Sequence, residues 1–213
     1  MHFTGILWAV LPALLWLIYF YRQDRLPEPP ALVLRTFLFG ALAVLPAALI
    51  ERRFVTNLGP GTPVFDVLVL SFLVIGLAEE LSKLATISLS VGRSGAIDSG
   101  VDGVVYGVSA GLGFAMLENI FYINSFGIGV APIRAIISNL AHALFSGVMG
   151  YHYAHGILWN RRKEKWRGLA WAVFLHGLYD FILISGLVSP FWSILLLVIA
   201  FDNVRRVFAR QRT

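Results

Sequence analysis

The chain of 213 residues is 58% hydrophobic and 14% charged, with a mean hydropathy of +0.76, which excludes an ordinary water-soluble domain. It contains no cysteine, so a cysteine protease, a disulfide framework and a cysteine-ligated zinc site are also excluded. The net charge of +5 comes from short basic runs between apolar stretches, which favours contact with anionic lipid, and we expect no nucleic-acid partner.

Seven apolar segments are long enough to cross a membrane, because a helix needs about 20 residues to span the hydrocarbon core. The first lacks a preceding basic region and a cleavage site, so we interpret it as a retained span. The last two are separated only by Ser189-Pro190, which leaves a broken helix there as an alternative. The sequence predicts an all-α, polytopic membrane bundle that forms a single domain over residues 1–213. The predicted spans are residues 3–21, 31–50, 64–91, 100–126, 133–158, 169–187 and 190–208.

The basic residues of the loops predict the orientation of the chain. Twelve Lys and Arg residues lie in residues 22–30, 92–99, 159–168 and the tail after Phe201. The loops of the opposite side contain only three, namely Arg52, Arg53 and Arg134. Because cytoplasmic loops carry the excess of Lys and Arg, we expect a multi-pass protein of the cell membrane, with its N-terminus outside and its C-terminus in the cytoplasm.

A stripe of small residues follows the predicted fourth span. Gly103, Gly107 and Gly111 recur every four residues, a doubled GxxxG pattern that allows another helix to approach closely. Glu118 lies seven residues after Gly111, almost two helical turns, and is therefore expected on nearly the same face, towards protein.

Ionisable residues lie near the middles of four predicted spans. Each charged group costs roughly 2.5–3.5 kcal/mol at the centre of a bilayer, so these side chains are expected to share a polar interior. They are Glu79, Glu80 and Lys83 in the third span, Glu118 in the fourth, His142 in the fifth, and His176 and Asp180 in the sixth.

The spacing of these residues points to catalysis as well as to charge neutralisation. Lys83 is within one helical turn of Glu79 and Glu80, but two carboxylates exceed one ammonium, and a surplus buried carboxylate suits a general base or a cation ligand. His176 and Asp180 lie on one helix face, where the carboxylate can orient the imidazole, contact the reacting group, or form only a structural hydrogen bond.

Two histidines and three glutamates from four helices offer the nitrogen and oxygen ligands that a catalytic zinc uses. The same groups could instead activate a water without metal, with a glutamate as base and with His176 and Asp180 or Asn119 stabilising the oxyanion. Both mechanisms remain open. His152 and His155, near the end of the fifth span, are interpreted as interfacial, and Asp102 as a helix cap.

At these residues the sequence resembles the PrsW family of intramembrane proteases and, more distantly, the type II CAAX prenyl endopeptidases. The resemblance implies a helical bundle with its site at membrane depth, site-1 cleavage of a single-span anti-sigma factor, and later release of a stress-response sigma factor. It rests on Glu28-Pro29, Glu79-Glu80-x-x-Lys83, Asp102-Gly-Val-Val-Tyr-Gly-Val-Ser, Gly-Phe114-x-x-x-Glu118-Asn119, His142-Ala-Leu and His176-Gly-x-Tyr-Asp180-Phe.

The resemblance also implies roles. Glu79 and Glu80 would contain the water-activating base, and His142 and His176 would be the remaining catalytic or metal-binding groups. Three positions depart from the CAAX pattern and favour the PrsW branch over prenylated substrates: Glu118 replaces a histidine, Asp180 replaces an asparagine, and Lys83 replaces an arginine expected one residue later.

We therefore predict one transmembrane catalytic domain, an intramembrane protease that acts in the lipid bilayer on a single-span protein. A proton-coupled transporter is the alternative, since buried acids and histidines also form proton relays, although no inverted repeat is found. The predicted catalytic residues are Glu79, Glu80, Lys83, Glu118, Asn119, His142, His176 and Asp180, and the candidate Zn²⁺ ligands are Glu80, Glu118, His142 and His176.

Overall fold

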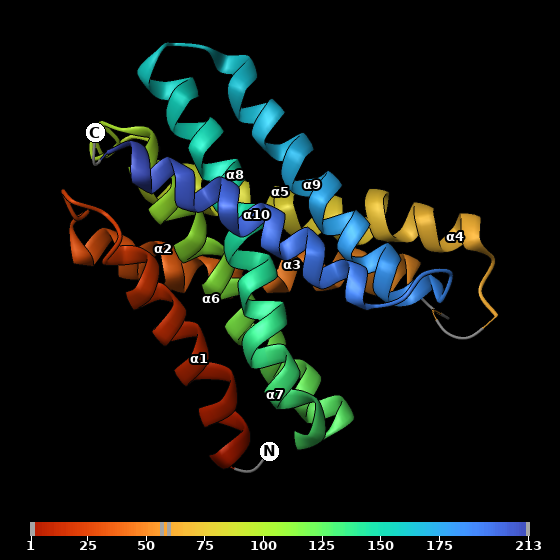
Figure 1. Cartoon of the computed structure of the whole chain (residues 1–213). Coiled ribbons are helices and arrows are strands. Elements are labelled where there is room, and N and C mark those ends of the chain that lie inside the picture. The colour runs from red at the N-terminus through yellow and green to blue at the C-terminus, as the bar shows by residue number, and fades with distance from the viewer. Residues whose placement is uncertain (1–2, 56–57, 59–60, 212–213) are drawn as a thin grey trace.

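The structure is a computed structural model that describes residues 3–55, 58 and 61–211. Gly59, Pro60 and Arg212, which contributed to the predicted loops and orientation, lie outside the described residues. Throughout the described ranges the regular elements are helices, which confirms the all-α prediction. Long helices cross one another at a range of angles, and the two termini lie at opposite ends of the bundle (Figure 1).

The helices follow the predicted spans closely, because each apolar run between breakers is long enough to satisfy its own backbone as one helix. A turn at Ala43 divides the second span into α2 and α3. The bounds are α1 Phe3–Tyr21, α2 Pro30–Leu42, α3 Val44–Phe54, α4 Val64–Val69, η1 Leu70–Gly76, α5 Leu77–Val91, α6 Gly100–Phe126, η2 Ile128–Val130, α7 Ala131–Ile133, η3 Arg134–Ser138, α8 Asn139–Leu158, α9 Arg162–Ser185 and α10 Phe191–Arg210.

Among the residues that the structure describes, five helices are long and apolar enough to cross a membrane. The other two predicted spans, Val64–Val91 and α10, are helical over the predicted lengths but carry more charged residues. The last predicted span is one continuous helix, α10, which begins after the turn at Ser189-Pro190. The five apolar helices are Phe3–Tyr21, Pro30–Phe54, Gly100–Phe126, Ile128–Leu158 and Arg162–Ser185.

The start of the sixth predicted span needs a correction. We expected a loop up to Gly168, but α9 begins at Arg162. The residues Arg162 to Arg167 are mostly good helix formers, and Glu164 places a negative charge in the first turn, where it interacts favourably with the helix dipole. The helix therefore extends past the apolar run as a basic, largely exposed turn.

Small residues bring α6 against α8, as the glycine stripe predicted. A methyl group built on Gly103, Gly107 or Gly111 would come within 2.2, 2.1 or 2.3 Å of a backbone oxygen of α8. For Gly111 that oxygen belongs to His142, so the close approach of the two backbones places His142 beside the face of α6 that carries Glu118.

A second close approach brings η1 against α9. A methyl group on Gly76 would lie 3.3 Å from the backbone nitrogen of Gly177, and one on Gly177 would lie 2.6 Å from the ring of Phe72. Both glycines adjoin site residues, because Gly76 precedes Glu79 by three positions and Gly177 follows His176. In addition, the π-helical turns η1 and η3 lead directly towards the helices that bear Glu79 and His142, and such turns often occur at functional sites.

Candidate active site

Lys83 of α5 lies at the centre of the buried charged residues. Its side chain is fully buried, and its Nζ donates to Glu79 Oε2 at 3.0 Å and to Glu80 Oε1 at 2.8 Å. The same Nζ is 2.8 Å from His142 Nδ1 and lies over the Phe114 ring, 4.1 Å from its centroid. The one-turn spacing of the sequence therefore produces the expected ion pairs, and α8 adds an imidazole to them.

His142 links Lys83 to Glu118. Its Nε2 is 3.1 Å from Glu118 Oε2, while its Nδ1 faces the ammonium. Because an ammonium can only donate hydrogen bonds, Nδ1 accepts, and a neutral ring then carries its hydrogen on Nε2 and donates it to Glu118. The two partners thus fix the tautomer of His142.

His176 of α9 faces carboxylates on both ring nitrogens. Its Nδ1 is 2.8 Å from Glu80 Oε1, and its Nε2 is 3.5 Å from Asp180 Oδ2 and 3.7 Å from Glu79 Oε2. The His142 and His176 rings are edge to face, with centroids 5.2 Å apart. The i,i+4 pair predicted on α9 therefore exists, and the glutamates of α5 surround the same imidazole.

Glu118 has a partner that the sequence analysis did not place in the site. Arg134 of η3 donates from NH2 to Glu118 Oε2 at 2.5 Å and from Nε to Asn119 Oδ1 at 2.7 Å. Asn119 in turn donates to Asn139 Oδ1 at 3.0 Å. Arg134 and Asn139 therefore engage both ends of the Asn119 amide, and Asn119 supports Arg134. Asn119 does not line the cavity that lies beside these residues.

A cavity of about 550 Å³ opens beside these groups, between α3, α5, α6, α8 and α9. Its polar lining is mostly acidic, so it suits a ligand that supplies hydrogen-bond donors or positive charge. Glu80 and Lys83 do not line it and lie deeper in the protein. The ionisable residues that line the cavity are Glu51, Glu79, Glu118, Arg134, His142, His176 and Asp180.

Four of the buried groups are close enough to share one metal ion. Glu79, Glu80, His142 and His176 each offer a ligand atom, and these atoms lie within 4.8 Å of one another. Two carboxylates and two imidazoles form a donor set that suits zinc. The sequence analysis proposed Glu118 as the fourth ligand, whereas the structure brings Glu79 into this group.

The sequence analysis did not identify two charged residues of the cavity, Arg134 and Glu51, for identifiable reasons. Arg134 was counted only as a loop charge, because it lies at the start of a span. Glu51 was overlooked because Glu51-Arg52-Arg53 is typical of a helix end at the membrane surface. Glu51 Oε1 is nevertheless buried and has no hydrogen-bond partner among the described residues. The signal that could have identified Glu51 is an acidic residue directly before the basic pair Arg52-Arg53 at the end of a helix.

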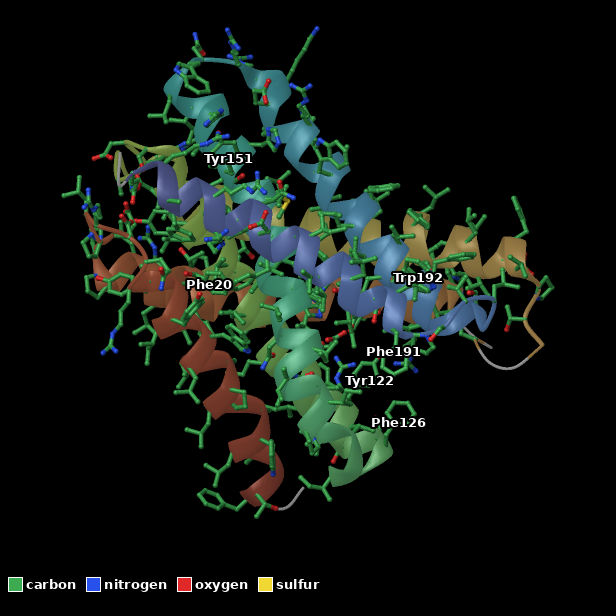
Figure 2. The ribbon with its side chains drawn as sticks, viewed as in Figure 1. Phe20, Tyr122, Phe126, Tyr151, Phe191 and Trp192 are labelled. Carbon is green, nitrogen blue, oxygen red and sulfur yellow. The ribbon has the colours of Figure 1, made fainter. Side chains whose placement is uncertain are left out.

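An apolar groove of about 660 Å³ adjoins the cavity. It lies at the C-terminal ends of α6 and α9 and at the N-terminal end of α10. Figure 2 shows Tyr122 and Phe126 of α6 beside Phe191 at the start of α10, and all three residues line this groove. Tyr122 and Arg134 line both the groove and the cavity, and the Arg134 guanidinium stacks 3.6 Å from the Tyr122 ring centroid. The groove and the cavity are therefore neighbours separated by a short polar-aromatic boundary.

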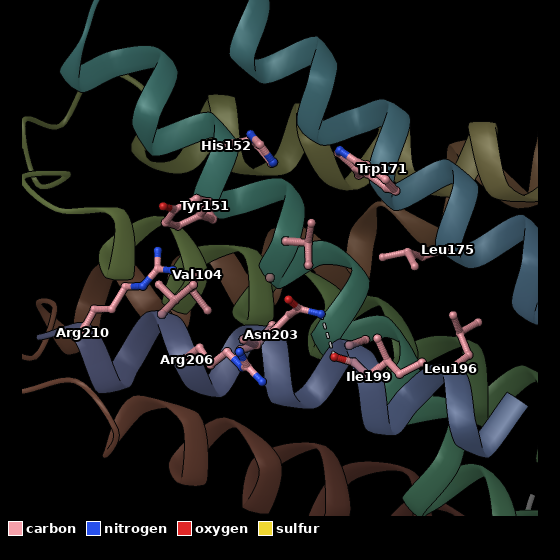
Figure 3. Close-up of a pocket in the computed structure, with 15 residues that line it drawn as sticks. Val104, Tyr151, His152, Trp171, Leu175, Leu196, Ile199, Asn203, Arg206 and Arg210 are labelled. Atoms are coloured by element: carbon pink, nitrogen blue, oxygen red, sulfur yellow. Dashed lines mark hydrogen bonds between the residues drawn. The ribbon is translucent and has the colours of Figure 1, made fainter.

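A second pocket lies on the opposite side of α8 and is separate from the site. It has a volume of about 420 Å³ and lies between α8, α9 and α10, with Tyr151, His152 and Trp171 in its wall (Figure 3). His152 Nδ1 is 3.1 Å from Glu164 Oε2. His152 thus has a local partner outside the active site, in keeping with the sequence interpretation.

Comparison with known proteins agrees with the geometry. The family described as "PrsW family intramembrane metalloprotease" matches residues 28–202. "Protease PrsW" of Oceanobacillus iheyensis is 34% identical over 93% of this chain and 93% of its own length. The proteins of the same name from Bacillus subtilis and Clostridioides difficile are 36% and 30% identical, over 82% and 90% of this chain and 80% and 82% of theirs. No solved structure matches.

The match covers the loop with Glu28, the helix with Glu79 and Glu80, and both site histidines. Relatives at 30–36% identity extend over most of the chain. The buried carboxylate–imidazole cavity therefore lies in a protein that belongs to the PrsW family of intramembrane metalloproteases.

Proposed function

We propose that this protease cleaves a single-span membrane protein, an anti-sigma factor, at site 1 of a regulated proteolytic cascade. The observation that carries the proposal is the gathering of Glu79, Glu80, His142 and His176 within 4.8 Å, next to a cavity that Glu79 and both histidines line. Groups of this kind activate water, and burial among helices gives access to a peptide bond at membrane depth.

Glu79 is the better candidate for the general base of the pair. It lines the cavity, whereas Glu80 is fully buried and its oxygens contact Lys83, His176 and Ser146. In the proposed reaction Glu79 takes a proton from water as the water oxygen attacks the scissile carbonyl carbon. Glu79 then returns the proton to the leaving amine nitrogen as the carbon–nitrogen bond breaks. Glu80 and Lys83 hold the base in position.

His176 would stabilise the developing oxyanion, whereas His142 donates its one N–H to Glu118 and would hold that carboxylate in position. His176 has Asp180 at 3.5 Å to orient its imidazole, and His142 is fixed between Lys83 and Glu118. Fixed N–H groups directed at the place where charge develops are the usual form of such stabilisation. Arg134 neutralises Glu118, and Asn119 positions Arg134.

A metal ion, if bound, would be held by Glu80, His142 and His176, which leaves Glu79 to act as the base, and we propose Zn²⁺ from the nitrogen and oxygen donors. A bound zinc lowers the pKa of its water and polarises the carbonyl. Elemental analysis of the purified protein tests this step, together with a cleavage assay before and after chelation and after readdition of zinc. Stoichiometric zinc with loss and recovery of activity supports it; full activity of metal-free protein refutes it.

The apolar groove at Tyr122, Phe126 and Phe191 offers a path by which a substrate helix could reach the cavity from the bilayer. Purified protein co-reconstituted in liposomes with a single-span candidate substrate tests the proposed function. Specific cleavage of the substrate supports it. Proton-dependent uptake of solute without cleavage would favour the transporter instead.

We also propose that the N-terminus is outside and the C-terminus cytoplasmic. The chain has no cysteine, so single cysteines introduced at Arg25 and at Gly129, an exposed position between α6 and α7, can be labelled separately. An impermeant thiol reagent added to whole cells should label the cysteine at position 129 and leave the one at position 25 unlabelled.

A further inference from the structure

Two of the stretches that resemble the PrsW family lie outside the active site and meet each other. Glu28 lies in the loop between α1 and α2, and Tyr106 lies near the start of α6. The Tyr106 hydroxyl donates to Glu28 Oε2, and the Tyr21 hydroxyl donates to the Glu28 backbone oxygen at 2.9 Å. Asp102 precedes Glu118 by sixteen helical residues, roughly 24 Å along α6, so this contact is remote from the cavity.

Three buried carboxylates gather at this contact. Asp24, Glu28 and Asp102 are only 5%, 5% and 2% exposed. One carboxylate oxygen of each lies within 4.8 Å of the other two. Three acids packed this closely repel one another when ionised, so a cation or a bound proton must offset the charge.

The three carboxylates accept hydrogen bonds from backbone amides and from the Ser99 and Tyr106 hydroxyls. The nearest arginine in sequence, Arg25, donates from NH1 to the Gln211 backbone oxygen at 3.1 Å. Asp24 Oδ1 accepts from the Leu26 amide at 3.0 Å, but Asp24 Oδ2 is buried and has no hydrogen-bond partner in the described part of the chain. A buried carboxylate oxygen without a protein partner costs free energy unless a hydrogen-bond donor or a cation satisfies it.

The remaining contacts orient the carboxylates and leave them free to bind a further group. Asp102 caps α6: its Oδ2 accepts from the Ser99 and Asp98 amides at 2.7 Å. An ionised carboxylate has about four lone-pair sites, so these bonds and the one from Tyr106 to Glu28 leave acceptor capacity. Burial also raises the pKa of Asp24, and raises that of Glu28 to about 7, because the ionised forms are poorly solvated.

We propose that Asp24, Glu28 and Asp102 form a binding site for a hard divalent cation, with Ca²⁺ as the best fit. All the donors are carboxylate oxygens, which suit Ca²⁺, Mg²⁺ and Mn²⁺ and are poor ligands for softer ions. The ligand atoms lie within 4.8 Å of one another, so the three carboxylates can share one such ion. Ca²⁺ is the better fit because it accepts an irregular set of carboxylate ligands, whereas Mg²⁺ requires near-ideal octahedral geometry.

A bound ion would join the α1–α2 loop to the start of α6. That connection holds α1 and α2 against the helix that carries Glu118, and it acts on stability without contacting the reacting groups. The site therefore has a readout that does not depend on the proposed protease chemistry.

Thermal unfolding of the purified full-length protein tests the site. The protein is treated with chelator, desalted, and heated with increasing Ca²⁺ or Mg²⁺. The unfolding temperature of the wild type is expected to rise with Ca²⁺, and less with Mg²⁺, while Asp24→Asn and Glu28→Gln lose the rise. Asp66→Asn, which changes an exposed acid on α4 away from the cluster, is the matched control and should keep it. Glu80→Gln should also keep it, which separates this site from the catalytic cluster.

Calorimetric titration of the wild type with Ca²⁺ gives a second measurement in case the variants fold poorly. One bound Ca²⁺ that survives Glu80→Gln supports the proposal. Absence of binding and of stabilisation by either ion overturns it, as does an equal temperature rise in the wild type, Asp24→Asn and Glu28→Gln. Loss of binding in Glu80→Gln alone would assign the ion to the active site and also overturn it.

Discussion

Replacing Lys83 by methionine removes the ammonium group that contacts both Glu79 and Glu80. The side chain is 0% exposed, and its Nζ lies within 3.0 Å of Glu79, Glu80 and His142. Methionine keeps most of the volume, so the main effect is a buried pair of carboxylates without an ammonium. Removal of one partner from a buried ion pair costs about 3–5 kcal/mol. For a chain of this size, roughly 2–4 °C per kcal/mol gives an unfolding temperature lower by roughly 6–20 °C.

The assay is thermal unfolding in a mild detergent, with Lys163→Met as an exposed control that should unfold like the wild type. Adding Glu80→Gln to Lys83→Met should recover part of the loss, because the second change removes an uncompensated buried charge. If Lys83→Met unfolds within about 0.5 kcal/mol of the wild type, or if the two losses simply add, the ammonium does not hold the acids together as described.

Three further predictions concern packing, pH and the cavity. Gly107→Ala should destabilise the protein by about 1–3 kcal/mol, because the new methyl would lie 2.1 Å from the α8 backbone; Gly129→Ala, which meets nothing within 4 Å, should be nearly neutral in the same unfolding assay. In the presence of chelator, the free energy of unfolding should decrease as the pH rises from 4.5 to 7. The folded state raises the pKa of Glu28 to about 7, so it keeps this proton at pH values where the unfolded state has lost it. Glu28→Gln should flatten this dependence. Glu51→Leu should raise the KM for substrate roughly ten- to a hundredfold by removing an unpaired cavity acceptor, whereas Arg53→Leu should not, and equal KM values would contradict the role of that acid.

The sequence predicted the helices well because their signal is local. Apolar runs of about 20 residues between breakers leave few alternatives to a spanning helix, and the α1 and α6 bounds agree with the predicted ranges. The Gly103 to Gly111 stripe also predicted a close helix contact correctly. The start of α9 was misplaced because hydrophobicity identifies the membrane segment, and a helix can continue beyond it when its residues favour helix.

The site was predictable as a set of residues but not as a set of contacts. Charges at mid-span depth identified Glu79, Glu118 and His142, since lipid penalises them wherever they point. Which carboxylate approaches the imidazoles depends on helix crossing and on the π-helical turns, and spacing along one helix carries no information about that. The partnership of Arg134 with Glu118 depends on the η3 turn and was hidden for the same reason.

The most direct test of the account is substrate cleavage by four purified variants, Glu79→Ala, Glu80→Ala, His142→Ala and His176→Ala, each compared with the wild type at equal amounts of folded protein. The account predicts that each variant loses at least about a hundredfold in rate, because each removes one group of a shared water-activating cluster. Asp202→Ala, on the exposed face of α10, should cleave at the wild-type rate. Folded variants of all four site residues that still cleave at the wild-type rate would contradict the account.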